Sequence, residues 1–261
     1  MKDWIKKELE DYKHLFRSIP ATIVMFFTLS VICMNLLANK LLLDPSVTEK
    51  IFGGFTLDCG FTISWISFLC MDIVCKRFGP RAATKLSIFA IVVNLLVTLA
   101  FNLLMLTPGL WWPAYLENGI VDVGINAALN SVFAGSWQIV IGSALALLLS
   151  SIVNSTLNFI IGKISHDDGS YKKFALRSFV STAAAQWVDN IVFVLALGVL
   201  LYSNIPEYFS AANLIINPII GMGFELICEV VFSPIGYKVS KEWATEGVGQ
   251  AYLNRIAKNQ K

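Results

Sequence analysis

Carboxylate, amide and aromatic side chains gather within one otherwise apolar stretch of the sequence. Gln186, Asp189 and Asn190 are separated by three and four residues, which places them on one broad face of a helix, with Trp187 beside it. A carboxylate accepts hydrogen bonds from N–H groups, and an amide both donates and accepts. An indole ring stacks on planar ligands. This face therefore has the chemistry to bind a small polar ring.

Two further carboxylates follow in the last apolar stretch. Glu225 and Glu229 are one helical turn apart, and Gly221 continues their face, where it would let a neighbouring helix or a ligand approach closely. An acidic side chain near the middle of a bilayer costs about 2.5–3.5 kcal/mol on insertion scales. We therefore expect Asp189, Glu225 and Glu229 to face a protein interior, a partner or water.

Polar side chains repeat at helical spacing in three other stretches. These stripes are Asn35 and Asn39; Asn94, Thr98 and Asn102; and Asn154 and Asn158. Polar stripes on separate helices are most stable when they face one another, so we expect them to line a cavity for a polar, planar solute, including a cationic one. Hydrogen bonding between helices explains Asn35, Asn94 and Asn102 equally well.

Asp72 lies at the end of an apolar stretch, just before a basic loop. Lys76 and Arg77 follow four and five residues later, and Arg81 follows nine residues later. Pairing with this loop explains Asp72 better than contact with a solute does. We therefore predict a structural or gating role for Asp72, Arg77 and Arg81.

Membrane-spanning helices are the elements that must position these side chains. Of the 261 residues, 56% are apolar and only 15% are charged, unlike an ordinary soluble domain. Apolar runs of about 20 residues match the thickness of a bilayer and predict an all-α membrane protein, a bundle of six transmembrane helices. The expected spans are residues 20–43, 55–75, 84–106, 131–162, 176–203 and 211–238.

Basic residues fall on alternate connections between these spans. Residues 1–19, 76–85, 163–177 and 238–261 hold 18 of the 20 lysines and arginines. Because positive charge is retained on the cytoplasmic side, we expect both termini in the cytoplasm. The predicted divisions are a cytoplasmic amphipathic interfacial helix (1–19), a six-helix transmembrane domain (20–240) and a cytoplasmic C-terminal tail (241–261).

Other functional classes lack the residues that they need. Both histidines, His14 and His166, lie in predicted cytoplasmic segments, and the sequence contains no HExxH, GxSxG or P-loop motif. The five cysteines form no CxxC pair, and the net charge of +2 is too small to indicate nucleic acid. We expect no enzymatic activity, cofactor or metal. The expected partners are a small-molecule substrate and the lipid bilayer, and a homo-oligomer is left open.

Four segments of the chain carry, in order, the pattern of a known family. They are residues 34–40 (MNLLANK), residues 68–72 (FLCMD) leading to Phe78 and Gly79, Ser181 and Thr182 with Asp189, and a last span ending in Pro234. Together they resemble the queuosine precursor transporters, also grouped as the vitamin uptake transporter (VUT) family. The resemblance covers most of residues 20–240. It implies a six-helix protein of the bacterial inner membrane that imports 7-cyano- or 7-aminomethyl-7-deazaguanine.

The resemblance also bears on individual residues. Asp72 and Asp189 match acidic positions of the family, and Asn35 matches its first-helix asparagine. The positions that depart from the family pattern are Gln138 (often arginine), Asn154 (often aspartate), Gln186 (usually asparagine) and Glu225 (often lysine). Reversing a charge inside the membrane changes which ligand charge is favoured. The resemblance therefore predicts the fold more directly than it predicts the cargo.

The expected function is import of a nucleobase-like solute, with a queuosine precursor as the specific cargo. The predicted substrate-binding residues are Asp189, Glu225, Gln186, Asn190, Trp187, Asn154, Glu229 and Asn35. Two alternatives remain. One is a substrate-capture subunit of an energy-coupling-factor vitamin transporter, although the first span lacks the Ala-x-x-x-Ala surface typical of such subunits. The other is a non-transporting membrane scaffold.

Overall fold

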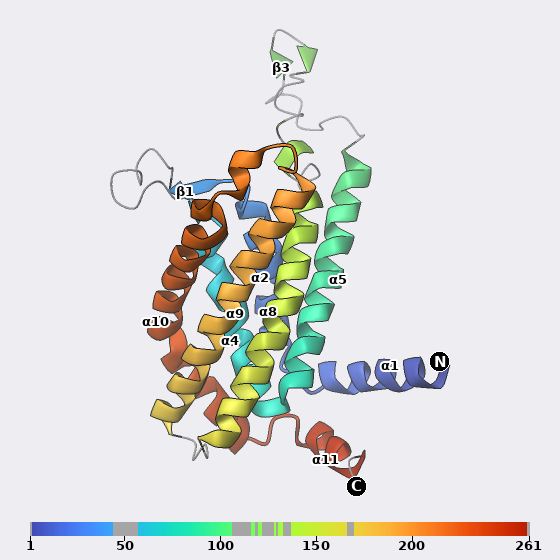
Figure 1. Cartoon of the computed structure of the whole chain (residues 1–261). Helices are drawn as coiled ribbons and strands as arrows, with labels where there is room; N and C mark the ends of the chain where they lie inside the picture. The colour runs from blue at the N-terminus through green and yellow to red at the C-terminus, as the bar shows by residue number, and fades with distance from the viewer. Residues whose placement is uncertain are drawn as a thin grey trace.

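Long apolar helices that lie side by side form the body of the protein (Figure 1). The computed structural model describes residues 2–43, 57–105, 116–117, 120–121, 128, 130–132, 137–165 and 170–259. Six of its helices have 17 to 30 residues. They are α2 (Ala21–Leu37), α4 (Phe61–Phe78), α5 (Pro80–Leu104), α8 (Trp137–Ile164), α9 (Tyr171–Leu200) and α10 (Asn217–Thr245).

Shorter elements connect and flank these helices. Two short helices stand at the ends of the chain, and two small antiparallel hairpins and two short irregular helical turns lie between the long helices. They are α1 (Lys2–Phe16), β1 (Leu41–Leu43) with β2 (Leu57–Asp58), β3 (Leu116–Glu117) with β4 (Ile120–Val121), η1 (Pro206–Phe209), η2 (Ala212–Ile216) and α11 (Gln250–Asn259).

The first predicted span is longer than the helix that the structure contains. We expected a helix to residue 43, but α2 ends at Leu37 and residues Leu41–Leu43 form β1. In this hairpin, Leu41 pairs with Asp58 of β2. The prediction was wrong here because a short apolar run does not by itself distinguish helix from strand.

Several helices are suited to cross a membrane. Among the described residues, α5, α9 and the helices that include α8 and α10 are long and apolar enough by themselves. A fifth candidate is the pair α1 and α2, which meet at a bend of 107°. Because α4 carries Asp72, Lys76 and Arg77, its composition is too polar for it to be counted. The fold is therefore that of a helical membrane protein with four to five candidate spans, and six spans stay a prediction.

The polar helix α4 lies inside the bundle. It packs against α2, α5, α8 and α10, and 11 of its 18 residues are buried. Its polar side chains therefore face protein rather than the outer surface. This enclosure explains how a helix with three charged residues fits among strongly apolar neighbours.

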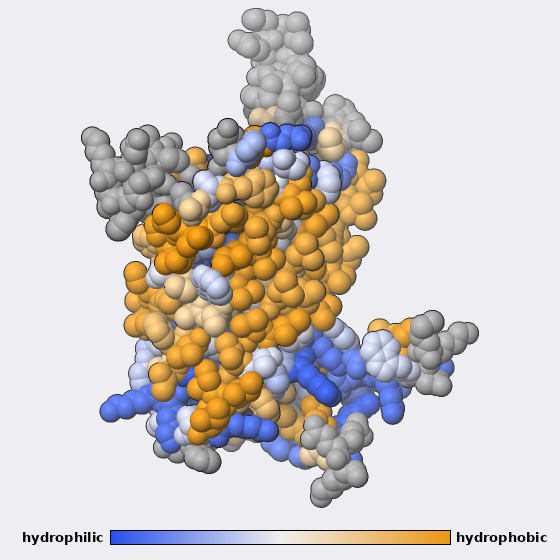
Figure 2. All heavy atoms as spheres, in the orientation of Figure 1, coloured by the Kyte–Doolittle hydropathy of each residue, from blue (hydrophilic) through white to orange (hydrophobic). Residues whose placement is uncertain are grey.

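A broad belt of apolar side chains covers the outside of the bundle in the view of Figure 2. Leu99 of α5, Val199 of α9 and Val231 of α10 are among its exposed members. Hydrophilic side chains lie at both ends of this belt, and more of them lie at the end where α1 and α11 are. An apolar belt of this size beside a polar end is the surface that a protein embedded in lipid requires.

Both chain termini lie at the same end of the bundle (Figure 1). Lys85 of α5 forms ion pairs with Glu8 of α1, at 2.8 Å, and with Asp11. The hydroxyl of Tyr252 on α11 donates to Asp11 at 3.2 Å. These contacts hold both terminal helices against the bundle, so the predicted tail contains an ordered helix. The placement of this end in the cytoplasm stays a prediction.

Candidate functional site

A cavity of about 260 Å³ lies between the helices at the end opposite the chain termini. Its walls come from the end of α2, the hairpin of β1 and β2, the beginnings of α4, α8 and α10, the second half of α9, and the turns η1 and η2. Binding pockets for drug-sized ligands measure about 300–1,000 Å³. This cavity therefore suits a smaller molecule.

Three carboxyl groups line the cavity: those of Asp58, Asp189 and Glu225. The Ser150 hydroxyl donates to Oδ1 of Asp189 at 2.8 Å, and the Ser64 hydroxyl donates to Oε1 of Glu225. Glu225 is only 3% exposed, and its Oε2 has no hydrogen-bond partner among the described residues. No lysine or arginine stands among the described lining residues. The cavity therefore offers acceptors and negative charge to a ligand.

A close approach between α2 and the beginning of α4 positions Asp58. The backbone N–H of Gly60 donates to Oδ1 of Asp58 at 2.6 Å. A Cβ atom at Gly60 would lie 2.7 Å from both this oxygen and the carbonyl oxygen of Met34, so only glycine fits there. Burial raises the pKa of Asp58, and the backbone N–H donors of Gly60 and Phe61 partly offset this rise.

Aromatic side chains form another part of the cavity wall. The rings of Tyr202 and Tyr208 stack with their centroids 4.4 Å apart, and both residues line the cavity together with Phe61 and Phe193. The Tyr208 hydroxyl donates to the carbonyl oxygen of Val194 at 3.2 Å. Burial raises the pKa of Tyr208 to about 12, so this hydroxyl stays neutral. These rings are suited to contact a planar ligand.

The structure brings four of the eight predicted binding residues together at the cavity. They are Asn35 of α2, Asp189 and Asn190 of α9, and Glu225 of α10. The Asn35 amide also donates to the carbonyl oxygen of Val31 at 2.9 Å, and that of Asn190 donates to the carbonyl oxygen of Pro218 at 3.3 Å. Backbone hydrogen bonds thus hold both amides in place at the wall.

Trp187, which we predicted to stack on a ligand, does not line the cavity. Its side chain is 48% exposed among the apolar residues of the outer surface. One residue turns a helix by about 100°, and this step carries Trp187 away from the face that Gln186, Asp189 and Asn190 share. The face that lines the cavity is narrower than the predicted face and does not include Trp187.

Gln186 lies between the cavity and a deeper polar cluster. It is wholly buried, and neither its amide oxygen nor its amide nitrogen has a hydrogen-bond partner among the described residues. It stands four residues after Thr182 and four before Asn190 on α9. It is not a lining residue of the cavity.

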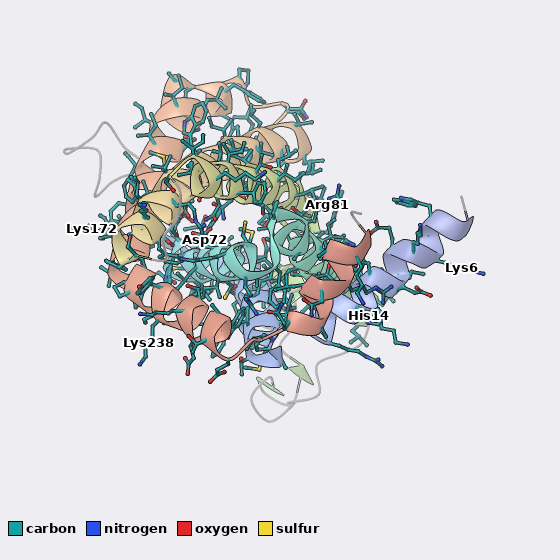
Figure 3. All side chains as sticks on the ribbon, turned by 90° about the horizontal axis from the view of Figure 1, so that it is seen from below. Lys6, His14, Asp72, Arg81, Lys172 and Lys238 are labelled. Atoms are coloured by element: carbon teal, nitrogen blue, oxygen red, sulfur yellow. The ribbon has the colours of Figure 1, made fainter. Side chains whose placement is uncertain are left out.

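Asp72, Asn154 and Glu229 belong to the deeper cluster rather than to the cavity. The Asn154 and Asn158 amides donate to Oδ1 of Asp72 at 2.8 and 3.1 Å. The Ser178 hydroxyl contacts Oδ2 of Asp72 and lies 2.6 Å from Oε1 of Glu229. Figure 3 shows Asp72 inside the ring of helices. The cluster joins α4, α8, α9 and α10.

The contacts that the structure gives for Asp72 lead to α8 and α9 rather than to Arg77 or Arg81 of the basic loop. Arg77 Nε donates to the carbonyl oxygen of Val248 at 2.9 Å, and Nη2 donates to Oε1 of Gln250 at 3.2 Å. Arg81 is exposed at the rim of the bundle (Figure 3). Helix α4 turns Asp72 inward, toward α8 and α9, whereas Arg77 reaches the turn before α11.

Sequence reasoning missed the serines that hold the carboxyl groups. Ser64, Ser150 and Ser178 each donate to, or contact, a carboxyl oxygen on another helix. Single serines are common in membrane helices, where many of them bond to the backbone of the preceding turn. Ser64 and Ser150 stand eight residues before Asp72 and four before Asn154, which is a weak signal of a shared helix face.

Apolar helices that enclose a polar, acidic cavity define the class of this protein as a helical membrane protein with an internal polar cavity. Residues 58–239, from β2 to α10, match the family described as "Putative vitamin uptake transporter", and the chain belongs to this family. The match confirms the family resemblance of the sequence. No curated protein and no solved structure matches the chain.

Proposed function

We propose that the protein imports a small, polar, nucleobase-like solute across the bacterial inner membrane. The specific cargo in this proposal is a queuosine precursor, 7-cyano- or 7-aminomethyl-7-deazaguanine. The observation that carries it is the cavity of about 260 Å³ whose described walls hold three carboxyl groups and no basic residue. The family to which the chain belongs supports transport as the activity.

The chemistry of the cavity matches that of the proposed cargo. A deazaguanine presents neighbouring N–H donors on its pyrimidine edge, and a carboxylate accepts such a pair well. Oε2 of Glu225, which has no partner among the described residues, is the acceptor that we assign to this edge. Asp189 or Asp58 then attracts the cation of an aminomethyl group, and the aromatic wall with Tyr208 covers the ring.

The side on which the cavity lies is consistent with import. The cavity is at the end of the bundle away from the chain termini. If the termini are cytoplasmic, as the distribution of basic residues predicts, the cavity faces the outside. In this orientation the structure is in an outward-facing conformation, which binds cargo from outside the cell.

Uptake by a bacterium that cannot make the precursor tests this proposal. Cells that express the chain receive labelled 7-cyano- or 7-aminomethyl-7-deazaguanine, and the label in tRNA is measured. We expect uptake that depends on the chain and that excess unlabelled precursor abolishes. Absence of uptake despite inserted, folded protein would rule out both cargoes, and a panel of purines and vitamins would then be tested in the same cells.

A further inference from the structure

Two carboxyl groups, which lie between the cavity and the end of the bundle that holds the chain termini, share one hydroxyl group. The Ser178 oxygen on α9 is within hydrogen-bond distance of Oδ2 of Asp72 and lies 2.6 Å from Oε1 of Glu229. Asp72 is 0% exposed and Glu229 is 1% exposed. The shared hydroxyl therefore joins α4, α9 and α10 in a fully enclosed place.

The number of protons in this contact is set by its geometry. A hydroxyl carries one proton, so Ser178 donates to only one of the two carboxyl groups. The other contact needs a second proton, which a carboxyl group carries and donates to the Ser178 oxygen. Two carboxylates that share a buried site do not both ionise, because their repulsion is poorly screened there. One of the two acids is therefore protonated.

The hydrogen-bond donors around the pair indicate which acid holds the proton. Asp72 accepts from the Asn154 amide at 2.8 Å, from the Asn158 amide at 3.1 Å and from the Thr182 hydroxyl at 3.3 Å. Such donors stabilise the ionised form. Glu229 lacks them, and its Oε2 has no hydrogen-bond partner among the described residues. The proton therefore belongs on Glu229.

The charges near the pair agree with this assignment. Arg177, which is also buried, attracts Asp72 electrostatically. Among the described residues, the Cys75 thiol interacts electrostatically with Asp72 and donates to a backbone carbonyl at 3.4 Å. The ammonium of Lys76, one turn after Asp72 on α4, lies 4.6 Å from the centre of the Phe174 ring. Because Arg177 balances Asp72, a protonated Glu229 adds no uncompensated charge to the buried cluster.

Polar side chains connect this pair to the cavity. Glu229 is one helical turn from Glu225, which lines the cavity. On α9, Gln186 stands one turn from Thr182 of the cluster and one turn from Asn190 of the cavity. Because both polar atoms of its buried amide have no partner among the described residues, Gln186 can turn toward either side. Occupation of the cavity by a ligand can thus change the hydrogen bonds around the carboxyl pair.

We infer that Glu229 is a proton-binding site that couples cargo import to the inward flow of protons, an inference that rests on the proposed function. A proton on Glu229 holds α10 against α4 and α9 through Ser178. Release of that proton to the cytoplasmic side leaves two anions at one hydroxyl, and their repulsion separates the helices. One proton therefore enters with each cargo molecule.

Proteoliposomes that contain the full chain test this coupling. The probe is labelled 7-cyano-7-deazaguanine, which is uncharged, and the membrane potential is clamped at zero. With the outside one pH unit more acidic, one proton per cargo molecule predicts about tenfold accumulation. Glu229→Gln keeps a donor toward Ser178 but holds no exchangeable proton. We expect it to exchange cargo at equal pH within about twofold of wild type and to lose accumulation.

Glu242→Gln is the matched control, since Glu242 is exposed on the same helix, and it should respond to the gradient as the wild type does. Exchange in wild type without any response to the pH gradient would overturn the proton inference and leave the proposed function standing. Absence of exchange with either 7-deazaguanine would instead remove the proposed cargo.

Infrared spectroscopy of the purified protein then decides on the proton site without any cargo. We expect a protonated-carboxyl C=O band at neutral pH that Glu229→Gln removes and Glu242→Gln keeps. Identical carboxyl bands in wild type and Glu229→Gln would overturn the proton site.

Discussion

The Ser150 hydroxyl of α8 lies 2.8 Å from Oδ1 of Asp189 on α9. This hydrogen bond crosses between two helices that pack along their length and holds the carboxyl group at the cavity wall. Among the described lining residues, no basic side chain balances it. An acid held in this way is available to a positively charged or N–H-rich ligand.

Replacement of Asp189 tests the charge of the cavity. Asp189→Asn keeps the size of the side chain and its contact with Ser150 but removes the negative charge. Hydrogen bonds to charged groups contribute about 1.5–3 kcal/mol, so we expect the initial rate of 7-aminomethyl-7-deazaguanine uptake to fall by about tenfold or more. Glu242→Gln serves as the control for loss of an acid outside the cavity. Wild-type uptake in Asp189→Asn would show that this carboxyl group does not contact the cargo.

Replacement of Trp187 separates the cavity from the outer surface of α9. Because the Trp187 side chain is 48% exposed on the outside, we expect Trp187→Leu to transport cargo within about twofold of wild type. Initial uptake rates, normalised to the amount of inserted protein, provide the measurement. A reduction of the uptake rate as large as that of Asp189→Asn would show that Trp187 contributes to cargo binding.

Two glycines on α10 form a matched pair for testing the size of the cavity. A Cβ atom at Gly221 would lie 2.7 Å from the Phe61 ring and 3.1 Å from the Asn190 amide, whereas nothing lies within 4 Å of one at Gly223. Since Phe61 and Asn190 line the cavity, we expect Gly221→Ala to reduce uptake by about tenfold. Gly223→Ala should keep uptake and favour the helix by up to about 1 kcal/mol. Equal uptake by both variants would contradict this geometry.

Asp58 predicts a pH dependence of cargo binding. Because burial raises the pKa of Asp58, this carboxyl group becomes neutral at a higher pH than an exposed aspartate would. Its attraction for a cation is present above the raised pKa and is lost as the pH falls through it. The affinity for 7-aminomethyl-7-deazaguanine should therefore fall on acidification more steeply in wild type than in Asp58→Asn. Parallel pH profiles of the two proteins, measured by equilibrium binding, would exclude Asp58 from the site.

The positions of the long helices could be predicted from the sequence because an apolar run of bilayer length leaves few alternatives to a helix. The polar stripes could be predicted as well, since helical spacing places Asp189 and Asn190 on one face. A short apolar run is compatible with either a helix or a strand. The strand Leu41–Leu43 at the end of the first apolar run was therefore not predicted.

The partners of the buried acids could not be predicted in the same way. The basic loop is four residues from Asp72 in the sequence, whereas Asn154, which bonds to it, is 82 residues away. The packing of α4 against α8 selects the distant partner, and the sequence alone does not specify that packing. Ser178, which joins Asp72 to Glu229, was missed because a single serine in an apolar helix carries little information.

Equilibrium binding to the purified full-length protein tests most directly whether the acidic cavity is the cargo site. Labelled 7-aminomethyl-7-deazaguanine is titrated into wild type, Glu225→Gln and the control Glu242→Gln. Because Oε2 of Glu225 has no partner among the described residues, we predict that Glu225→Gln raises the Kd by about tenfold or more while the control leaves it unchanged. The same Kd in all three proteins, or no binding to wild type, would contradict the assignment of this cavity to the cargo.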